Sequence, residues 1–324
     1  MASPLPTDPH GLIVYRDVAE LGLRADLDTA FRHGEIERVG RGVYRVVEHD
    51  AGLSPAQQDA QRYRRTVLAA ARRMKDAIFT SYSAAALLGL PVVGRWPEDV
   101  YVLARDRHAR RRRGVVHVAC DTAGRTAVVD GLVTTSVELT LIQLARHAPL
   151  SAALPAFDAA IHVPRHGTAS PLTTRERIQA EHERLVPYPR RHKVEAVLDR
   201  CTPKAESAFE SMSRLTIEEL GFAEPELQVR FWLPELAQEA YLDFYWRDAG
   251  VGGEADGDGK YLDGAGAAGA ARRVVDEKRR EDELRAQLTG FVRWDWQDMW
   301  RRTPLERKLL RAGVPRPRMP RRFR

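Results

Sequence analysis

Residues 240–257 read AYLDFYWRDAGVGGEADG, and the fold of the chain can be inferred outward from them. The first seven residues, Ala240 to Trp246, are mostly aromatic and aliphatic and therefore predict a strand. Asp243 is the only acidic residue within that strand. Glycines at 250, 252 and 253 predict a turn, after which Glu254 and Asp256 follow. The segment thus predicts two neighbouring strands that each carry a carboxylate.

The flanking sequence extends this pair of strands into a mixed α/β domain. Glu206 and Glu210 lie four residues apart, so they share one face of a predicted helix that ends at Gly221. The predicted order is a helix, a strand, the Asp243 strand, the Glu254 strand, a charged helix and a last strand, at residues 206–220, 227–231, 240–246, around 254, 272–287 and 291–294.

Carboxylates on adjacent strands are suited to holding a divalent cation. Hydrolysis of a phosphodiester requires Mg²⁺ or Mn²⁺ close to the phosphate, where the ion activates water and neutralises the developing charge. Asp243 and Glu254 are the expected metal ligands, and Glu210 would orient a metal-bound water. In a protein without this activity, Asp243 and Glu254 would be solvated strand-end carboxylates, and the charges at 277–285 would form the solvated face of a helix.

The C-terminal sequence resembles the Vsr-like (very-short-patch-repair-like) endonucleases. This resemblance implies the PD-(D/E)xK nuclease core, in which a mixed sheet flanked by helices holds a Mg²⁺ or Mn²⁺ ion. The pieces that carry it are AESAFESMSRLTIEELGFAEPELQ, YLDFYW, GEADGDGKY, DEKRREDELR and FVRWDWQDM, which begin at residues 205, 241, 253, 276 and 291.

The sequence departs from that family at one position, because Asp256 stands where the Glu-x-Lys motif has its lysine. The resemblance implies that Glu210 and Asp256 are supporting carboxylates. It also implies that Lys260 or Lys278 supplies the positive charge that the motif lysine would have given. The expected catalytic residues are therefore Glu210, Asp243, Glu254, Asp256, Lys260 and Lys278.

The N-terminal residues predict a small DNA-binding unit. Helix-like patterns at Ile13 to Leu21 and Leu23 to His33 precede two short strands joined at Gly40-Arg41-Gly42. Two helices followed by a hairpin with a basic tip is the order of a winged helix. In that fold the second helix enters the major groove, and hairpin residues such as Arg38 and Arg41 contact phosphates. Other small α/β units share this order.

The same region resembles the winged helix of AbiE-type (type IV) antitoxins over GLIVYRDVAELGLRADLDTAFRHGEIERVGRGVYRV, which begins at residue 11. Two later pieces, SAAALLGLP from residue 83 and GLVTTSVELTLIQLAR from residue 131, are similar to the region that follows that winged helix. The resemblance implies DNA binding, and it allows a toxin or another defence protein as a partner.

Six arginines fall within the nine residues from Arg105 to Arg113. They lie between strands predicted at Val100–Leu103 and Val115–Val118, as a hairpin loop would. Clustered like charges repel one another unless an anion compensates them. A solvated hairpin without a partner is the alternative. The residues expected to contact DNA phosphates are Arg110, Arg111, Arg112 and Arg113.

Composition narrows the remaining possibilities. The chain has 324 residues, a formal net charge of +6 and a pI near 9.5, which favours an anionic partner such as double-stranded DNA. Cys120 and Cys201 are isolated, and no run approaches about 18 apolar residues, so we expect a cytoplasmic protein without a membrane segment. Domains are expected at residues 1–50 (winged helix), 51–190 (α/β middle domain with a linker) and 191–324 (nuclease-like domain with a basic tail).

Three functions are compatible with these features of an α+β chain. The first is a DNA-binding endonuclease that acts in DNA repair or phage defence. The second is a catalytically inactive, antitoxin-like transcriptional regulator that keeps the nuclease fold as a binding scaffold. The third is a component of a defence system that recognises modified or mismatched DNA. The glycine-rich residues 257–269 lack the lysine and serine or threonine that end a Walker loop, which argues against nucleotide binding.

Overall fold

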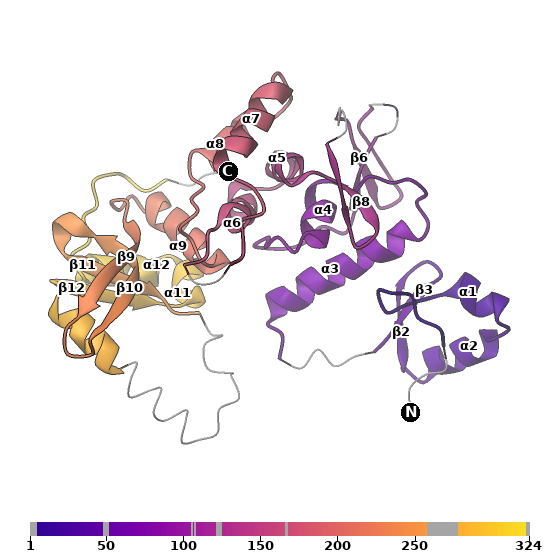
Figure 1. Cartoon of the computed structure of the whole chain (residues 1–324), viewed down its shortest axis with the longest axis horizontal. Helices are drawn as coiled ribbons and strands as arrows, with labels where there is room; N and C mark the ends of the chain where they lie inside the picture. Colours follow the sequence, from indigo (N-terminus) through magenta and orange to yellow (C-terminus); the bar gives the residue numbers. More distant parts are fainter. Residues whose placement is uncertain are drawn as a thin grey trace. The chain divides into compact units, whose positions relative to one another are not determined.

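The structure is a computed structural model that describes residues 5–47, 52–104, 106, 108–120, 125–165, 168–257 and 278–321. It has mixed α/β architecture with several small sheets (Figure 1), in agreement with the expected α+β class. Contacts divide the chain into two compact units. The first comprises Met1–Ala148 and Glu176–Glu195, and the second comprises Pro149–Arg175 and Ala196–Arg324. No helix in these described ranges is both long enough and apolar enough to cross a bilayer.

The first unit begins with a three-stranded antiparallel sheet and two short helices. The strand order is β1-β3-β2, and Ile13, Val18 and Leu27 are buried in its core. The helix expected from Ile13 starts later than predicted, because residues 12–14 pair with β3, and so short a strand has no periodic pattern. The elements are β1 (Leu12–Val14), α1 (Tyr15–Glu20), α2 (Arg24–Arg32), β2 (Ile36–Gly40) and β3 (Val43–Val46).

The rest of the first unit is built around the buried helix α4 (Ser81–Leu87). This helix packs against α3 (Pro55–Ala71) and α5 (Val137–His147). A capping box starts α3, since the side chains of Ser54 and Gln57 each accept a hydrogen bond from the other residue's backbone N–H. Most of α7 (Arg175–Leu185) and the first residues of α8 (Arg191–Leu198) also belong to this unit.

The first unit has two further small sheets, one that includes part of the arginine-rich segment and one that follows it in sequence. β4 (Val100–Leu103) and β6 (Val115–Val118) pair in parallel, and β5 (Arg110–Arg112) pairs antiparallel with β6 at the edge of the sheet. The prediction of a hairpin loop across 105–113 is therefore wrong. Three of its arginines form an edge strand, and the tight turn lies at Arg113 and Gly114, which both have positive φ. A second hairpin is formed by β7 (Thr126–Val129) and β8 (Leu132–Thr135).

The second unit is built on a four-stranded sheet of order β12-β11-β10-β9. The β11–β12 pair is parallel and the other two pairs are antiparallel. The strands predicted around Asp243 and Glu254 are confirmed as β10 and β11. A Cβ on Gly253 would lie 2.9 Å from the Trp294 ring, so close packing requires this glycine. The strands are β9 (Glu226–Leu233), β10 (Gln238–Trp246), β11 (Val251–Ala255) and β12 (Gly290–Trp294).

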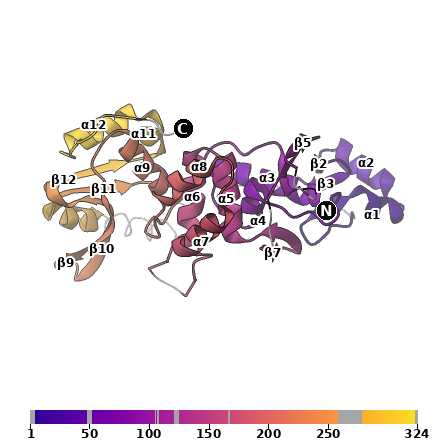
Figure 2. The ribbon, with the colours of Figure 1, turned by 90° about the horizontal axis from the view of Figure 1, so that it is seen from above.

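The helices of the second unit pack against its sheet and against one another. The helix predicted at 206–220 is observed as α9 (Ala208–Glu219), and Ser207 is its N-cap. Residues 278–286 are helical, whereas the predicted start of that helix, at 272–277, lies outside the described residues. α11 (Trp296–Arg301) contacts α9, and α12 (Thr303–Arg311) packs against β12 (Figure 2).

The division into units differs from the domains expected at 51–190 and 191–324. α6 (Leu150–Ile161) packs along α9 and belongs to the second unit. The chain then returns to the first unit at Glu176 and reaches the second unit again at Ala196. The division cannot follow from local sequence, because the packing of the apolar helix α6 depends on residues about 50 positions later in the chain.

Candidate functional site

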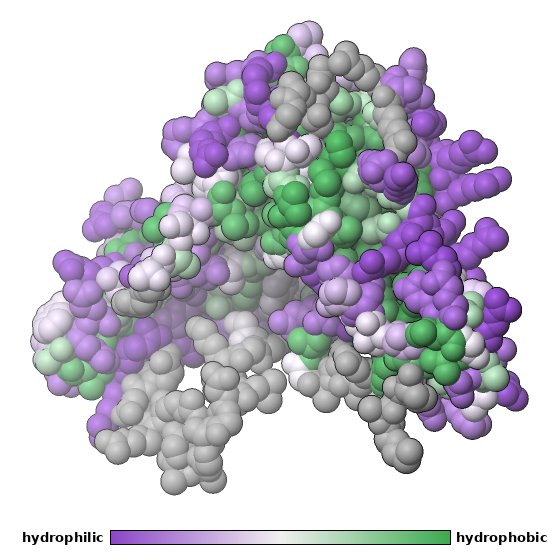
Figure 3. All heavy atoms as spheres, turned by 45° about the vertical axis from the view of Figure 1, so that its right-hand side comes forward, coloured by the Kyte–Doolittle hydropathy of each residue, from purple (hydrophilic) through white to green (hydrophobic). Residues whose placement is uncertain are grey.

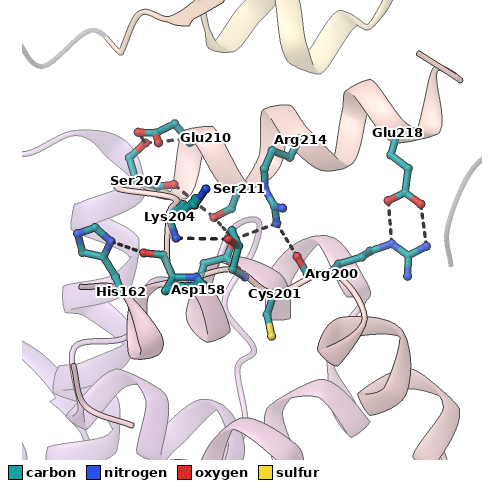
Figure 4. Close-up of polar contacts among 12 residues, drawn as sticks. Asp158, His162, Arg200, Cys201, Lys204, Ser207, Glu210, Ser211, Arg214 and Glu218 are labelled. Carbon is teal, nitrogen blue, oxygen red and sulfur yellow. Dashed lines mark hydrogen bonds and ion pairs between the residues drawn. The ribbon is translucent and has the colours of Figure 1, made fainter. Parts of the chain in front are cut away.

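Glu210 lies in the first turn of α9 and is 7% exposed. Its backbone N–H donates to Ser207 Oγ at 3.1 Å, and its Oε1 accepts a hydrogen bond from the Ser207 hydroxyl at 2.9 Å. Its Oε2 accepts from the backbone N–H of Glu206 at 3.0 Å. Figure 4 shows the Glu210 carboxylate turned back towards Ser207. The start of the helix therefore fixes the position of this acid.

A single glutamine connects Glu210 to Asp243. The Nε2 of Gln228, in β9, donates to Glu210 Oε2 at 2.9 Å and to Asp243 Oδ1 at 3.3 Å. Asp243 Oδ2 accepts from the backbone N–H of Ala255, in β11, at 3.0 Å. Two carboxylates, one from a helix and one from a strand, thus reach one amide nitrogen. Gln228 was not expected to be a site residue.

Glu254 is 8% exposed and is held by two arginines. Its Oε1 lies 3.1 Å from an amino group of Arg280, and its Oε2 accepts a hydrogen bond from Arg293. Arg293 pairs with Glu254 in the register of β12 and β11 and also lies 3.3 Å from Glu281 and 4.0 Å from Asp256. Burial opposes the charge on Arg293, but Glu254, Glu281 and Asp256 together raise its pKa. The guanidinium therefore stays charged.

These donors fit a divalent cation in part. Glu210 and Asp243 bring carboxylate oxygens to one place, around the amide nitrogen of Gln228, and carboxylate oxygens suit a hard ion such as Mg²⁺. Within the residues that the structure describes, however, no three His, Cys, Asp or Glu side chains lie close enough to share an ion. Glu254 is directed to Arg280 and Arg293. The two expected ligands lie on adjacent strands. Asp243 accepts hydrogen bonds from Gln228 and Ala255, whereas Glu254 pairs with the two arginines.

The structure describes only one of the two candidate lysines. Lys260 lies outside the described residues, and Lys278 is exposed at the start of the helical residues 278–286. Arg280 and Arg293 supply the positive charge beside Glu254 instead. The sequence did not predict Arg293, because its contact with Glu254 depends on the parallel register of β11 and β12. Arg280 could not be distinguished from the other charged residues of its helix.

No protein-family model and no curated protein matches this chain. The geometry of its residues is therefore the basis for assigning its function.

The predicted DNA-contacting arginines lie on the first unit. Arg38 and Arg41 are exposed, and Arg38 Nε donates to the carbonyl of Gly40 at 3.2 Å, next to the β2–β3 turn. All three residues of the edge strand β5 are exposed, as is Arg113. Arg110 pairs with Asp106 and Arg111 with Asp99, at 2.5 and 2.7 Å. Figure 3 shows hydrophilic side chains projecting along the edges of the face it draws.

A separate cavity of about 480 Å³ lies beside α9, and none of the predicted catalytic residues lines it. Its wall includes Arg200, Cys201, Arg214 and Phe222. Arg200 is committed to Glu218 by two hydrogen bonds of 2.9 Å (Figure 4). Burial raises the pKa of the Cys201 thiol to about 11, so this cysteine is not an activated nucleophile. The chemistry of the acidic residues is therefore the stronger basis for a function.

Proposed function

We propose that this chain is a DNA-binding protein whose second unit is a metal-dependent phosphodiesterase of the PD-(D/E)xK type. Its substrate would be double-stranded DNA, in repair or phage defence. The observation that carries the proposal is the approach of Glu210 and Asp243 to one amide nitrogen of Gln228, beside the strand that bears Glu254. Acids from a helix and two adjacent strands can gather around a divalent cation, which would activate water for hydrolysis of a phosphodiester.

The residues have distinct roles in this proposal. Asp243 and Glu254 would hold Mg²⁺ or Mn²⁺, which when bound would lower the pKa of a water and neutralise charge on the phosphate. Glu210 would accept a proton or hydrogen bond from that water, since its position is set by the capping contacts of α9. Arg280 and Arg293 would bind phosphate oxygens, in place of Lys260 or Lys278, and Asp256 would keep Arg293 in place.

DNA binding is proposed for the first unit as a winged helix. Support comes from the strand order β1-β3-β2, with α1 and α2 between the first two strands and a basic residue, Arg41, at the β2–β3 turn. In this arrangement α2 would enter the major groove and Arg38 and Arg41 would contact phosphates. The exposed edge strand β5, with Arg110, Arg111 and Arg112, and the adjoining Arg113 would add further phosphate contacts.

A second candidate is an inactive, antitoxin-like regulator with a toxin or defence protein as partner. It is favoured by the pairing of Glu254 with Arg280 and Arg293, because a metal ion would have to displace these arginines to bind the carboxylate. Under this proposal the same arginines hold the sheet together at its β12 edge, and the chain binds DNA without cutting it.

Cleavage of supercoiled plasmid in Mg²⁺ or Mn²⁺ distinguishes the two. The wild-type chain is expected to nick the plasmid, and Asp243→Asn is expected to lose at least about 100-fold in rate while DNA binding in EDTA is unchanged. Asp248→Asn is the matched control, since Asp248 is an exposed acid five residues later. Wild-type rates in Asp243→Asn would remove the site. DNA binding without cleavage by the wild type would establish the second candidate.

A further inference from the structure

Gln228 occupies a backbone position that few residues with a side chain adopt. Its φ is +53°, within the left-handed region, although it lies inside β9. The pairs Leu242–Val229 and Phe244–Leu227 on either side hold it opposite Asp243 in the register of β9 and β10. Non-glycine residues in this region persist only where the surrounding structure imposes them, and such positions cluster at functional sites.

The nitrogen and the oxygen of the Gln228 amide differ in their hydrogen bonding. Its Nε2 donates to Glu210 and to Asp243, whereas its Oε1 is buried and has no hydrogen-bond partner among the described residues. Buried acceptors without a partner are rare, since they lose water without replacing it. The nitrogen must face the carboxylates as long as nothing more positive lies between them, because the oxygen there would be repelled.

We infer that Gln228 is a further ligand of the proposed cation and that its amide rotates when the ion binds. This inference rests on the proposed function and adds an oxygen donor to the proposed site, next to Asp243 and Glu210. Before the ion arrives, the NH₂ group separates the two carboxylates. A divalent cation in the same place reverses the preference, so that Oε1 turns towards the ion and Nε2 leaves the carboxylates. Rotation about the terminal torsion exchanges the two ends without moving β9.

Mn²⁺ titration of the full-length protein by calorimetry, without DNA, tests this role. Gln228→Leu removes both the oxygen and the nitrogen and is expected to weaken Mn²⁺ binding by about tenfold or more. Gln228→Glu keeps an oxygen donor and adds charge, so it is expected to bind Mn²⁺ at least as tightly as the wild type. Gln238→Leu is the matched control, because Gln238 is an exposed glutamine at the start of β10.

Thermal unfolding with and without Mn²⁺ separates a ligand from a residue that only supports the fold. Gln228→Glu places three carboxylates together, so it is expected to lower the midpoint without metal and to gain more from Mn²⁺ than the wild type does. If both Gln228 variants bind Mn²⁺ as the wild type does, the inference is overturned while the Asp243 site stands. If the wild type does not bind Mn²⁺ at all, the inference and the proposed function fall together.

Discussion

Asp158→Asn is expected to change how the stability of the second unit responds to pH. Asp158 lies in α6 and is 1% exposed. Its carboxylate accepts hydrogen bonds from the backbone N–H of Thr202 at 2.8 Å and from the Ser211 hydroxyl at 2.7 Å, with Arg214 at 3.4 Å (Figure 4). Burial raises the pKa of this carboxyl to about 6, although Arg214, Ser211 and Thr202 all act to lower it.

The sign of the effect follows from the protons bound in each state. Between the ordinary pKa of 3.8 and about 6, the folded chain keeps a proton that the unfolded chain has released. The contribution of Asp158 to stability therefore grows as the pH falls through this window and is lost as the pH rises through about 6. A difference of about two pKa units corresponds to about 3 kcal/mol, of which about 2 kcal/mol develops between about pH 7 and pH 4.5.

The measurement is urea unfolding of the wild type and of Asp158→Asn at several pH values, followed by tryptophan fluorescence. Groups other than Asp158 titrate equally in both proteins, so they cancel in the difference. As the pH is lowered, the free energy of unfolding of the wild type is expected to rise by about 2 kcal/mol relative to that of the variant. Exposed Asp248→Asn should follow the wild type throughout. Parallel curves for the wild type and Asp158→Asn, or a gain with rising pH, would refute the assigned shift.

Two further substitutions test the fold and the DNA interface. Gly221→Ala places a Cβ 2.2 Å from the backbone oxygen of Arg318. Gly313 has a similar φ and open space around it, so Gly221→Ala should destabilise the chain by about 2 kcal/mol more than Gly313→Ala. Equal unfolding free energies of the two variants would contradict this. The double variant Arg112→Ala/Arg113→Ala should reduce the slope of log affinity against log salt for duplex DNA by about 1 to 2, as expected for the loss of one or two phosphate contacts. Fluorescence anisotropy measures this slope, with exposed Arg95→Ala as control, and a slope as steep as that of the wild type would exclude β5 from the interface.

The strands around Asp243 and Glu254 and the helix α9 could be predicted because their evidence is local. An aromatic run predicts β10, a glycine turn separates it from β11, and Gly221 ends the helix. In the N-terminal region the order of α1, α2 and the β2–β3 hairpin also followed from nearby residues. In each case the decisive interactions join residues only a few positions apart, such as the Ser207 cap on Glu210.

Pairing between distant residues could not be predicted in this way. With β4 and β6 paired in parallel, the arginines at 110–112 form an edge strand instead of a loop. The packing of α6 on α9 moves residues 150–161 into the second unit. Neither follows from periodicity, because a strand or helix presents the same local pattern whichever partner it has.

Residue types and the predicted elements that carry them made Glu210, Asp243 and Glu254 candidate acids and the arginines candidate phosphate contacts, because carboxylates and arginines keep their charge wherever they lie. Only the folded chain placed the amide of Gln228 between two of those acids and directed Arg280 and Arg293 at the third. The reason is that charge balance in a buried site depends on which strands are neighbours and in what register. Sheet order is set by contacts between segments far apart in the chain.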